Sequence, residues 1–188
     1  MILSTCKNKQ MSLVKMTTKK LTLMAILTAV ALIIFIVEAQ IPVPIPVPGM
    51  KLGLANAVTL FALFYGVTQH HPHVFLTTAN AFTILLCRIV LGAVFTGRPI
   101  AFVYSIAGGL LAFAAQVIMK RFVSNKQIWV CGAAGAVFHN AGQITAAVMI
   151  TGTPAIAAYL PVLIITGIFT GVFTGLIAQF SLARINKR

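Results

Sequence analysis

The sequence predicts an all-α membrane protein with six transmembrane helices and both termini in the cytoplasm. Its 188 residues are 60% hydrophobic and 8% charged, and a mean hydropathy of +1.02 is too apolar for a soluble domain of this size. The apolar residues form six runs that polar or turn-forming segments separate. The 14 Lys and Arg residues gather beside alternate runs, which is the pattern of retention on one side of a membrane.

The first 20 residues are polar and carry five lysines, so they are predicted to form a basic cytoplasmic tail. The apolar run 21–37 follows and is the first predicted span. A secretory signal peptide is the alternative, because Val37-Glu38-Ala39 loosely resembles a small-residue cleavage site. The run is long for the apolar part of a signal peptide, so a retained span is preferred.

Proline then shapes the connection to the second span. Alternate positions hold Pro42, Pro44, Pro46 and Pro48, which forbid helix and favour a stiff extended strap. The chain's only carboxylate side chain, Glu38, precedes this strap, and Lys51 and Asn56 follow it. We expect the strap on the outer face, where it and these polar groups form the mouth of a membrane site.

Five further apolar runs are predicted to span the membrane, each bounded by a polar or Gly/Pro turn. They are 52–67, 74–95, 100–119, 128–150 and 155–182. Residues 21–182 are therefore predicted to form a single transmembrane domain, between the tail 1–20 and a second basic cytoplasmic tail, 183–188.

The positions of the basic residues support this topology. Five lie in the first tail, three in the loop 120–126 and three in the last tail, which places 11 of the 14 on the side of the termini. Lys51 and Arg98 fall outside, and Arg88 falls within a span. Because the cations adjoin apolar spans, the net charge of +13 does not indicate nucleic-acid binding. The prediction is a multi-pass protein of the bacterial cell membrane, in contact with lipid.

Arg88 is predicted to lie roughly 10 Å from the outer end of its span. A charge at that depth is costly unless it is paired or faces a wet cavity, so a functional site is the first interpretation. A structural ion pair with Glu38 is the alternative, and both interpretations place Glu38 near Arg88. If the two pair, Lys51 and Arg98 leave an excess of positive charge that suits an anionic ligand.

The run 128–150 contains a polar group near its middle, formed by His139, Asn140 and Gln143. His139 and Gln143 share a helical face, and Asn140 and Gln143 are neighbours three residues apart. Uncharged polar groups at that depth need partners. Hydrogen bonding between helices and contact with a ligand are both open, and Asn56, which enters from the same outer half, favours the ligand.

No metal site, resident cofactor or catalytic group is predicted. The cysteines Cys6, Cys87 and Cys131 are widely spaced, and a solvated turn is preferred over a metal site for His70, His71 and His73. With one Glu and no Asp, these residues supply neither the aspartate cluster that holds magnesium on a diphosphate nor an ATPase loop. The chain is therefore not expected to be an enzyme.

Small residues recur at four-residue spacing in two of the predicted spans. Gly167, Gly171 and Gly175 form a face that lets another helix approach closely, most simply within the same bundle. Ala25 and Ala29 form a similar pair in the first span.

Five segments together resemble the Gx transporter family, which is also labelled heptaprenyl diphosphate synthase component I. They are 46–56, 88–92, 105–109, 139–143 and 159–163, and the resemblance runs from about residue 21 to residue 180. The Lys-Leu-Gly-Leu-Ala-Asn block and the His-Asn-x-Gly-Gln block are the most specific of them.

The family is similar in topology to the substrate-binding S components of energy-coupling factor vitamin transporters. That resemblance implies an S-component-like bundle of six helices, which binds its ligand from outside and docks onto a coupling transmembrane subunit and its ATPases through Ala25 and Ala29. The family label implies instead an accessory subunit in isoprenoid or menaquinone side-chain synthesis, and members are linked with flavin or quinone functions.

Two main functional hypotheses follow, and a scaffold for a membrane redox complex is a third alternative. In the first, the chain transports or binds a small polar or anionic solute, with Lys51 and Arg88 on its anionic part. Glu38 positions Arg88, while Asn56, His139, Asn140 and Gln143 donate or accept hydrogen bonds. In the second, the chain is a noncatalytic membrane partner of a polyprenyl diphosphate synthase.

Overall fold

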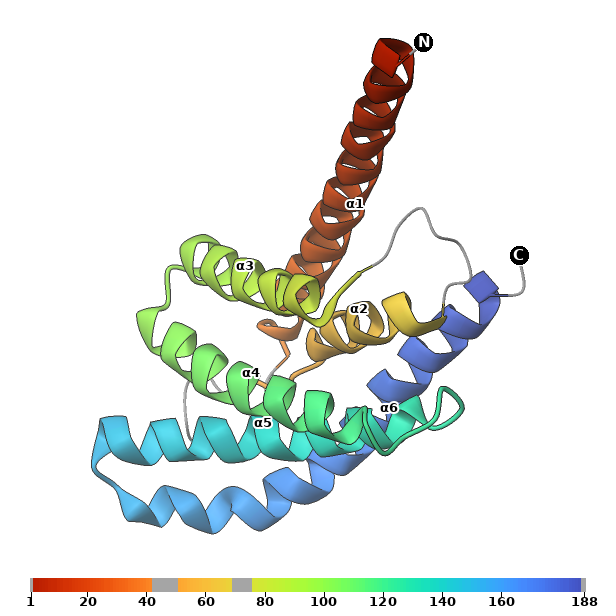
Figure 1. Cartoon of the computed structure of the whole chain (residues 1–188). Helices are drawn as coiled ribbons and strands as arrows, with labels where there is room; N and C mark the ends of the chain where they lie inside the picture. The colour runs from red at the N-terminus through yellow and green to blue at the C-terminus, as the bar shows by residue number, and fades with distance from the viewer. Residues whose placement is uncertain (1, 42–50, 69–75, 187–188) are drawn as a thin grey trace.

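The computed structural model describes residues 2–41, 51–68 and 76–186, with side chains from residue 18 to residue 185 apart from 42–50 and 66–75. Within these residues the chain forms six α-helices and one 3-10 helix, which confirms the predicted all-α fold (Figure 1). The elements are α1 (Ile2–Glu38), α2 (Asn56–Thr68), α3 (Thr78–Thr96), α4 (Pro99–Met119), α5 (Ile128–Thr151), η1 (Pro154–Tyr159) and α6 (Leu160–Asn186). The proline strap and the three histidines at 70, 71 and 73 lie outside the described residues.

Several predicted boundaries moved for local reasons. The second helix begins at Asn56 and not at residue 52, because Gly53 adopts a left-handed backbone with φ of 82°. The third begins at Thr78, where the Thr77 hydroxyl accepts the amide of Asn80 at 3.3 Å. The sixth predicted run divides into η1 and α6. The turns after α3 and α5 are as predicted, with Gly97 and Gly152 in the left-handed C-cap conformation.

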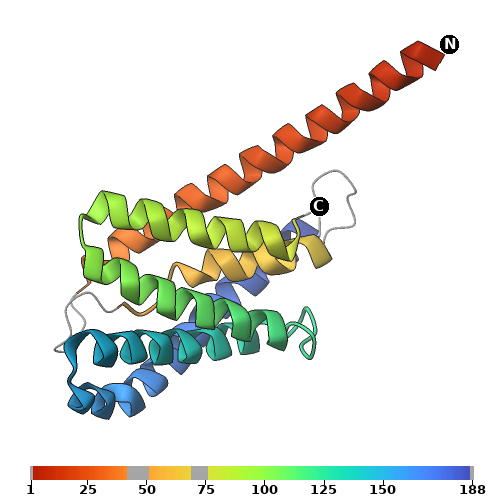
Figure 2. The same cartoon turned by 60° about the vertical axis from the view of Figure 1, so that its left-hand side comes forward.

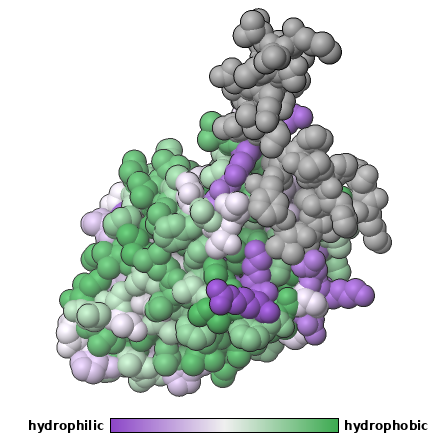
Figure 3. Space-filling view, viewed as in Figure 1, coloured by the Kyte–Doolittle hydropathy of each residue, from purple (hydrophilic) through white to green (hydrophobic). Residues whose placement is uncertain are grey.

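Four segments of the described chain are long and apolar enough to cross a membrane: Thr18–Glu38, Thr78–Thr96, Pro99–Met119 and Pro154–Ile185. The apolar part of α2 is shorter, and α5 is interrupted by its polar group. Most of the coloured surface in Figure 3 is apolar, and the exposed side chains of the described residues include Phe169, Phe173 and Met149. This surface is that of a membrane protein. Six spans and cytoplasmic termini remain predictions.

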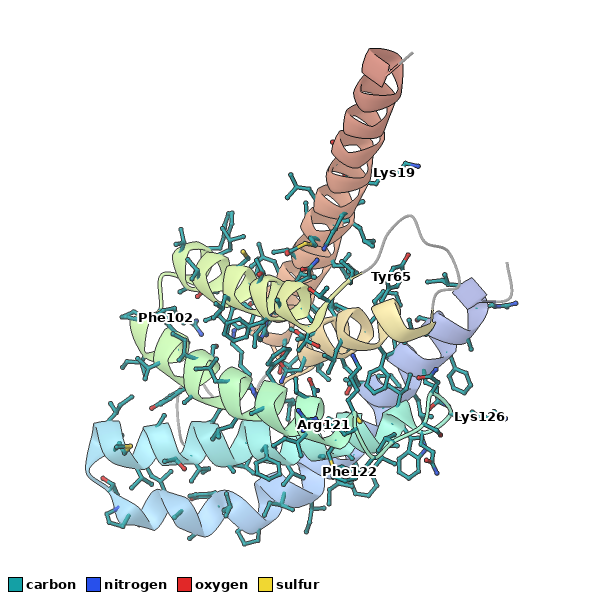
Figure 4. The ribbon with its side chains drawn as sticks, in the orientation of Figure 1. Lys19, Tyr65, Phe102, Arg121, Phe122 and Lys126 are labelled. Carbon is teal, nitrogen blue, oxygen red and sulfur yellow. The ribbon has the colours of Figure 1, made fainter. Side chains whose placement is uncertain are left out.

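The helices form a bundle from which the N-terminal half of α1 projects (Figure 2). The α4–α5 connection and the C-terminus lie at one end, and the α3–α4 and α5–η1 connections lie at the other (Figures 1 and 2). Figure 4 accordingly shows Arg121, Phe122 and Lys126 at the α4–α5 connection, far along α4 from Phe102. The basic loop and the C-terminus therefore share an end, which the predicted topology requires.

Helix α5 is the centre of the packing, with α4 on one side and α6 on the other. Its first turns enter one hydrophobic cluster through Ile128 and Cys131. Its last turns enter a second cluster through Ile144 and Ala147. The polar residues of α5 lie between these two clusters, so the apolar core is divided around a polar layer.

The glycines of α6 pack inside the bundle, as predicted. A Cβ atom at residue 171 would lie 2.6 Å from the carbonyl oxygen of Gly132, and one at residue 175 would lie 2.5 Å from Cα of Trp129. No real side chain tolerates such distances to backbone atoms, so α5 and α6 touch backbone to backbone. This contact sets the close separation of α5 and α6.

We predict that Gly171→Val destabilises the protein by about 1–3 kcal/mol, because the added methyl groups push α6 away from α5. The measurement is unfolding of the protein in detergent micelles. The matched control is Phe173→Val, which changes a side chain 61% exposed on the same helix and is expected to have a much smaller effect. Equal losses in the two variants would contradict the close contact.

Candidate functional site

The segment between the strap and α2 brings four helices together. Lys51–Ala55 has no regular structure, and it is followed by the first turn of α2. From α1, the Glu38 carboxylate accepts the backbone amide of Gly53, and the Leu54 amide also hydrogen-bonds to it. These amides lie just before the α2 N-terminus, where backbone donors have no helical partner and negative charge is stabilising. The carboxylate of α1 therefore holds the turn that leads into α2.

Helix α5 holds the same segment through two side chains. The Lys51 amide donates to Oε1 of Gln143 at 3.1 Å, and Nε2 of Gln143 lies 2.7 Å from Nε2 of His139. Both α5 residues are almost fully buried. A Cβ atom at residue 53 would lie 2.7 Å from Cδ2 of His139. Glycine is therefore needed at this position both for its positive φ and for the close approach of the His139 ring.

Helix α3 contributes Arg88, whose Nη2 donates to Oδ1 of Asn56 at 3.2 Å. The side chain of Arg88 is only 2% exposed. Its guanidinium carbon lies 5.7 Å from the ring centroid of Phe35, and Nζ of Lys51 lies 3.0 Å from the same centroid. The ring of Phe35 thus stabilises two buried cations through its π face.

Glycines on neighbouring helices make room for this arrangement. A Cβ atom at residue 92 would lie 2.5 Å from Cε1 of Phe35, so Gly92 of α3 provides the seat of that ring. On α4, a Cβ atom at residue 108 would lie 2.7 Å from Nδ1 of His139, while residue 109 faces Ile89 and Arg88. The adjacent glycines of α4 therefore admit α5 on one side and α3 on the other.

Six of the seven predicted ligand-binding residues come together and form what we call the polar cluster. Its members are Glu38, Lys51, Asn56, Arg88, His139 and Gln143, all 8% exposed or less. The seventh, Asn140, faces α6 and donates its side-chain amide to the carbonyl of Leu163 at 2.6 Å. It lies one residue beyond His139, so the helical repeat turns it toward α6.

The predicted partnership of Glu38 and Arg88 takes a different form. The Glu38 carboxylate hydrogen-bonds to the backbone amides and attracts both Arg88 and Lys51 electrostatically, while the guanidinium of Arg88 donates to Asn56. Glu38 and Arg88 are therefore linked through the segment that they both hold.

Sequence reasoning missed two parts of the cluster. Phe35 precedes Glu38 by three residues on α1 and so lies on its face, but an aromatic residue in an apolar run gives no distinct signal. The backbone amides of Gly53 and Leu54 also escaped notice, although a lone carboxylate near a helix start is a pattern that could have indicated them.

The polar cluster contains donors without acceptors. Nζ of Lys51, Nε of Arg88 and Nδ2 of Asn56 are buried and have no hydrogen-bond partner within the described part of the chain. One carboxylate faces two cations.

Burial lowers the pKa of Lys51, which precedes α2, to about 8, although the attraction of Glu38 raises it. Among the described residues, no group of three His, Cys, Asp or Glu is placed to hold a metal ion.

We predict that Glu38→Gln destabilises the protein by about 3–5 kcal/mol, because it leaves Lys51 and Arg88 as uncompensated buried cations. Unfolding in nanodiscs or detergent measures the change. The double variant Glu38→Gln with Lys51→Met removes one cation as well, so it should recover part of the loss. A double variant that is no more stable than Glu38→Gln alone would contradict the electrostatic explanation.

The comparisons with known proteins give one result. The family model described as heptaprenyl diphosphate synthase component I matches residues 27–181, a range that includes all six residues of the polar cluster. Comparison with curated proteins and with solved structures found no match. The apolar helices of the chain are those of a membrane protein. Because the family model covers most of the chain, the chain belongs to the heptaprenyl diphosphate synthase component I family.

Proposed function

We propose that this protein is a membrane transport protein, or an S-component-like substrate-binding subunit, for a small polar or anionic solute linked to isoprenoid, quinone or flavin metabolism. The observation that carries the proposal is the set of unpartnered buried donors on Lys51, Asn56 and Arg88. Buried donors and charges without partners are costly, and a protein that only needed stability would be better served by apolar side chains there. A bound solute supplies the missing acceptors.

In this proposal each residue of the polar cluster has a distinct role. Lys51 and Arg88 bind the anionic or most polar part of the solute, and Glu38 holds the segment that positions them. Asn56 donates its free amide nitrogen, while His139 and Gln143 fix the Lys51 backbone and complete the wall. Asn140 serves the same site indirectly, through the α5–α6 contact at Leu163.

The proposal includes docking onto a partner in the membrane. Ala25 and Ala29 are exposed on α1, as are the apolar side chains of Ile26, Val30 and Ile33. A face of small and apolar residues suits close packing against another transmembrane helix. An energy-coupling transmembrane subunit, itself associated with ATPases, is the partner that we propose for it.

We predict that Arg88→Gln abolishes retention of the solute by the protein extracted from its native membrane. In this variant the negative charge of Glu38 faces the single positive charge of Lys51, and the Gln side chain retains a hydrogen-bond donor for Asn56. The variant is therefore expected to fold. Mass spectrometry of the bound small molecules would show at least about a tenfold loss against wild type. Arg121→Gln is the matched control, because that exposed arginine lies at the α4–α5 connection. Unchanged retention and uptake in a folded Arg88→Gln variant would count heavily against the proposal.

A second candidate function rests on the family description itself. In it the protein is a noncatalytic membrane subunit that holds a soluble polyprenyl diphosphate synthase. The synthase supplies the aspartate-bound magnesium chemistry, because the one Glu of this chain is already committed to backbone amides.

The same extraction, with mass spectrometry of the proteins, tests this second candidate. It predicts recovery of an aspartate-rich synthase and a change in prenyl chain length when this protein is deleted. Recovery of a coupling subunit with its ATPases, together with unchanged quinone side chains in the deletion strain, would exclude it.

A further inference from the structure

We infer that the polar cluster takes a ligand group with a single negative charge, a carboxylate, and does not take a diphosphate. This inference rests on the proposed function, since it names the class of solute for that site. It follows from two properties of the cluster, its charge and its unpartnered donors.

The polar cluster carries one more positive charge than negative charge. Arg88 and Lys51 carry two positive charges, and Glu38, the only carboxylate side chain of the chain, carries one negative charge. All three side chains are buried, so water does not compensate the remaining charge. One further negative charge neutralises the cluster. A diphosphate would bring at least two and leave a buried negative charge in place of the positive one.

Four polar atoms of the polar cluster have no hydrogen-bond partner within the described part of the chain. Nζ of Lys51, Nε of Arg88 and Nδ2 of Asn56 are donors, and the first two carry the positive charge. The fourth is Nδ1 of His139, which carries the proton of a neutral imidazole whose Nε2 accepts from the Gln143 amide, so it is a donor as well. A carboxylate only accepts hydrogen bonds and has two oxygens with which to do so. A neutral amide would bring donors of its own into a place already rich in donors. Donor number and charge therefore select the same chemical group.

The side chains that carry these donors contact one another or share a neighbour. Asn56 and Arg88 are hydrogen-bonded to each other, so the free nitrogen of Asn56 lies beside the guanidinium. Lys51 and Arg88 both lie against the ring of Phe35, which Gly92 seats from α3. The Glu38 contact with Gly53 anchors the backbone segment that carries Lys51 and leads to Asn56.

The charge of the polar cluster also bears on the family description, heptaprenyl diphosphate synthase component I. If the cluster takes a monoanion, the diphosphate of a prenyl substrate does not bind there. Any link to a synthase must then use another surface.

The test measures the thermal unfolding of the purified full-length protein in nanodiscs with three probes at constant ionic strength. Acetate is a minimal monocarboxylate, acetamide is its neutral counterpart, and inorganic diphosphate carries several charges. We expect acetate to raise the unfolding temperature saturably and the other two probes to have no saturable effect. Lys51→Met should weaken the apparent acetate affinity by at least about tenfold. Lys51→Arg should retain the response, and Lys126→Met, at an exposed lysine, is the charge-matched control.

The outcomes separate this inference from the proposed function. A saturable response to diphosphate that Lys51→Met removes would overturn the monoanion and leave a solute site in place, as would an equal response to acetamide. An acetate response unchanged in Lys51→Met would overturn the assignment to this cluster. If no probe acts, the small molecule extracted with the wild-type protein decides: one carboxylate supports the inference and a neutral or multiply charged molecule overturns it. Failure of every probe with no extracted molecule would overturn the proposed function too.

Discussion

The contact between Glu38 and the amides of Gly53 and Leu54 is the interaction on which the rest of the structure depends. It joins the end of α1 to the start of α2 across the strap, and it fixes the backbone that carries Lys51 and Asn56. Gln143 on α5 accepts the amide of Lys51 from that segment, and Arg88 on α3 donates to Asn56 directly after it. A single carboxylate thereby organises elements from four helices.

The way the apolar core is divided explains how such a cluster is tolerated. One hydrophobic cluster surrounds Ile128 and Cys131, and another surrounds Tyr104 and Ile144. Close glycine contacts between α4, α5 and α6 let these helices pack tightly on both sides of the polar layer. The dispersion energy of that packing offsets the desolvation of the buried polar groups.

Much of the fold was predictable because apolar runs and Gly/Pro turns are local signals. The ends of α4 and α5 fell within a residue or two of their predicted places, and six of seven candidate ligand-binding residues converge. What the sequence did not reveal depends on three-dimensional proximity. The direction of Asn140, the seat of Phe35 on Gly92 and the use of Glu38 on amides all require knowing which helices are neighbours. The late start of α2 was missed because a left-handed glycine leaves no mark in a hydropathy pattern.

The bond between the Lys51 amide and Gln143 has a consequence for how the protein is made. Its two ends are 92 residues apart, so a ribosome has completed α2, α3 and α4 before the partner of the α2 entry segment exists. Polar backbone at membrane depth is stable only when protein covers it. The segment before α2 therefore lacks its contact with Gln143 until α5 has been made.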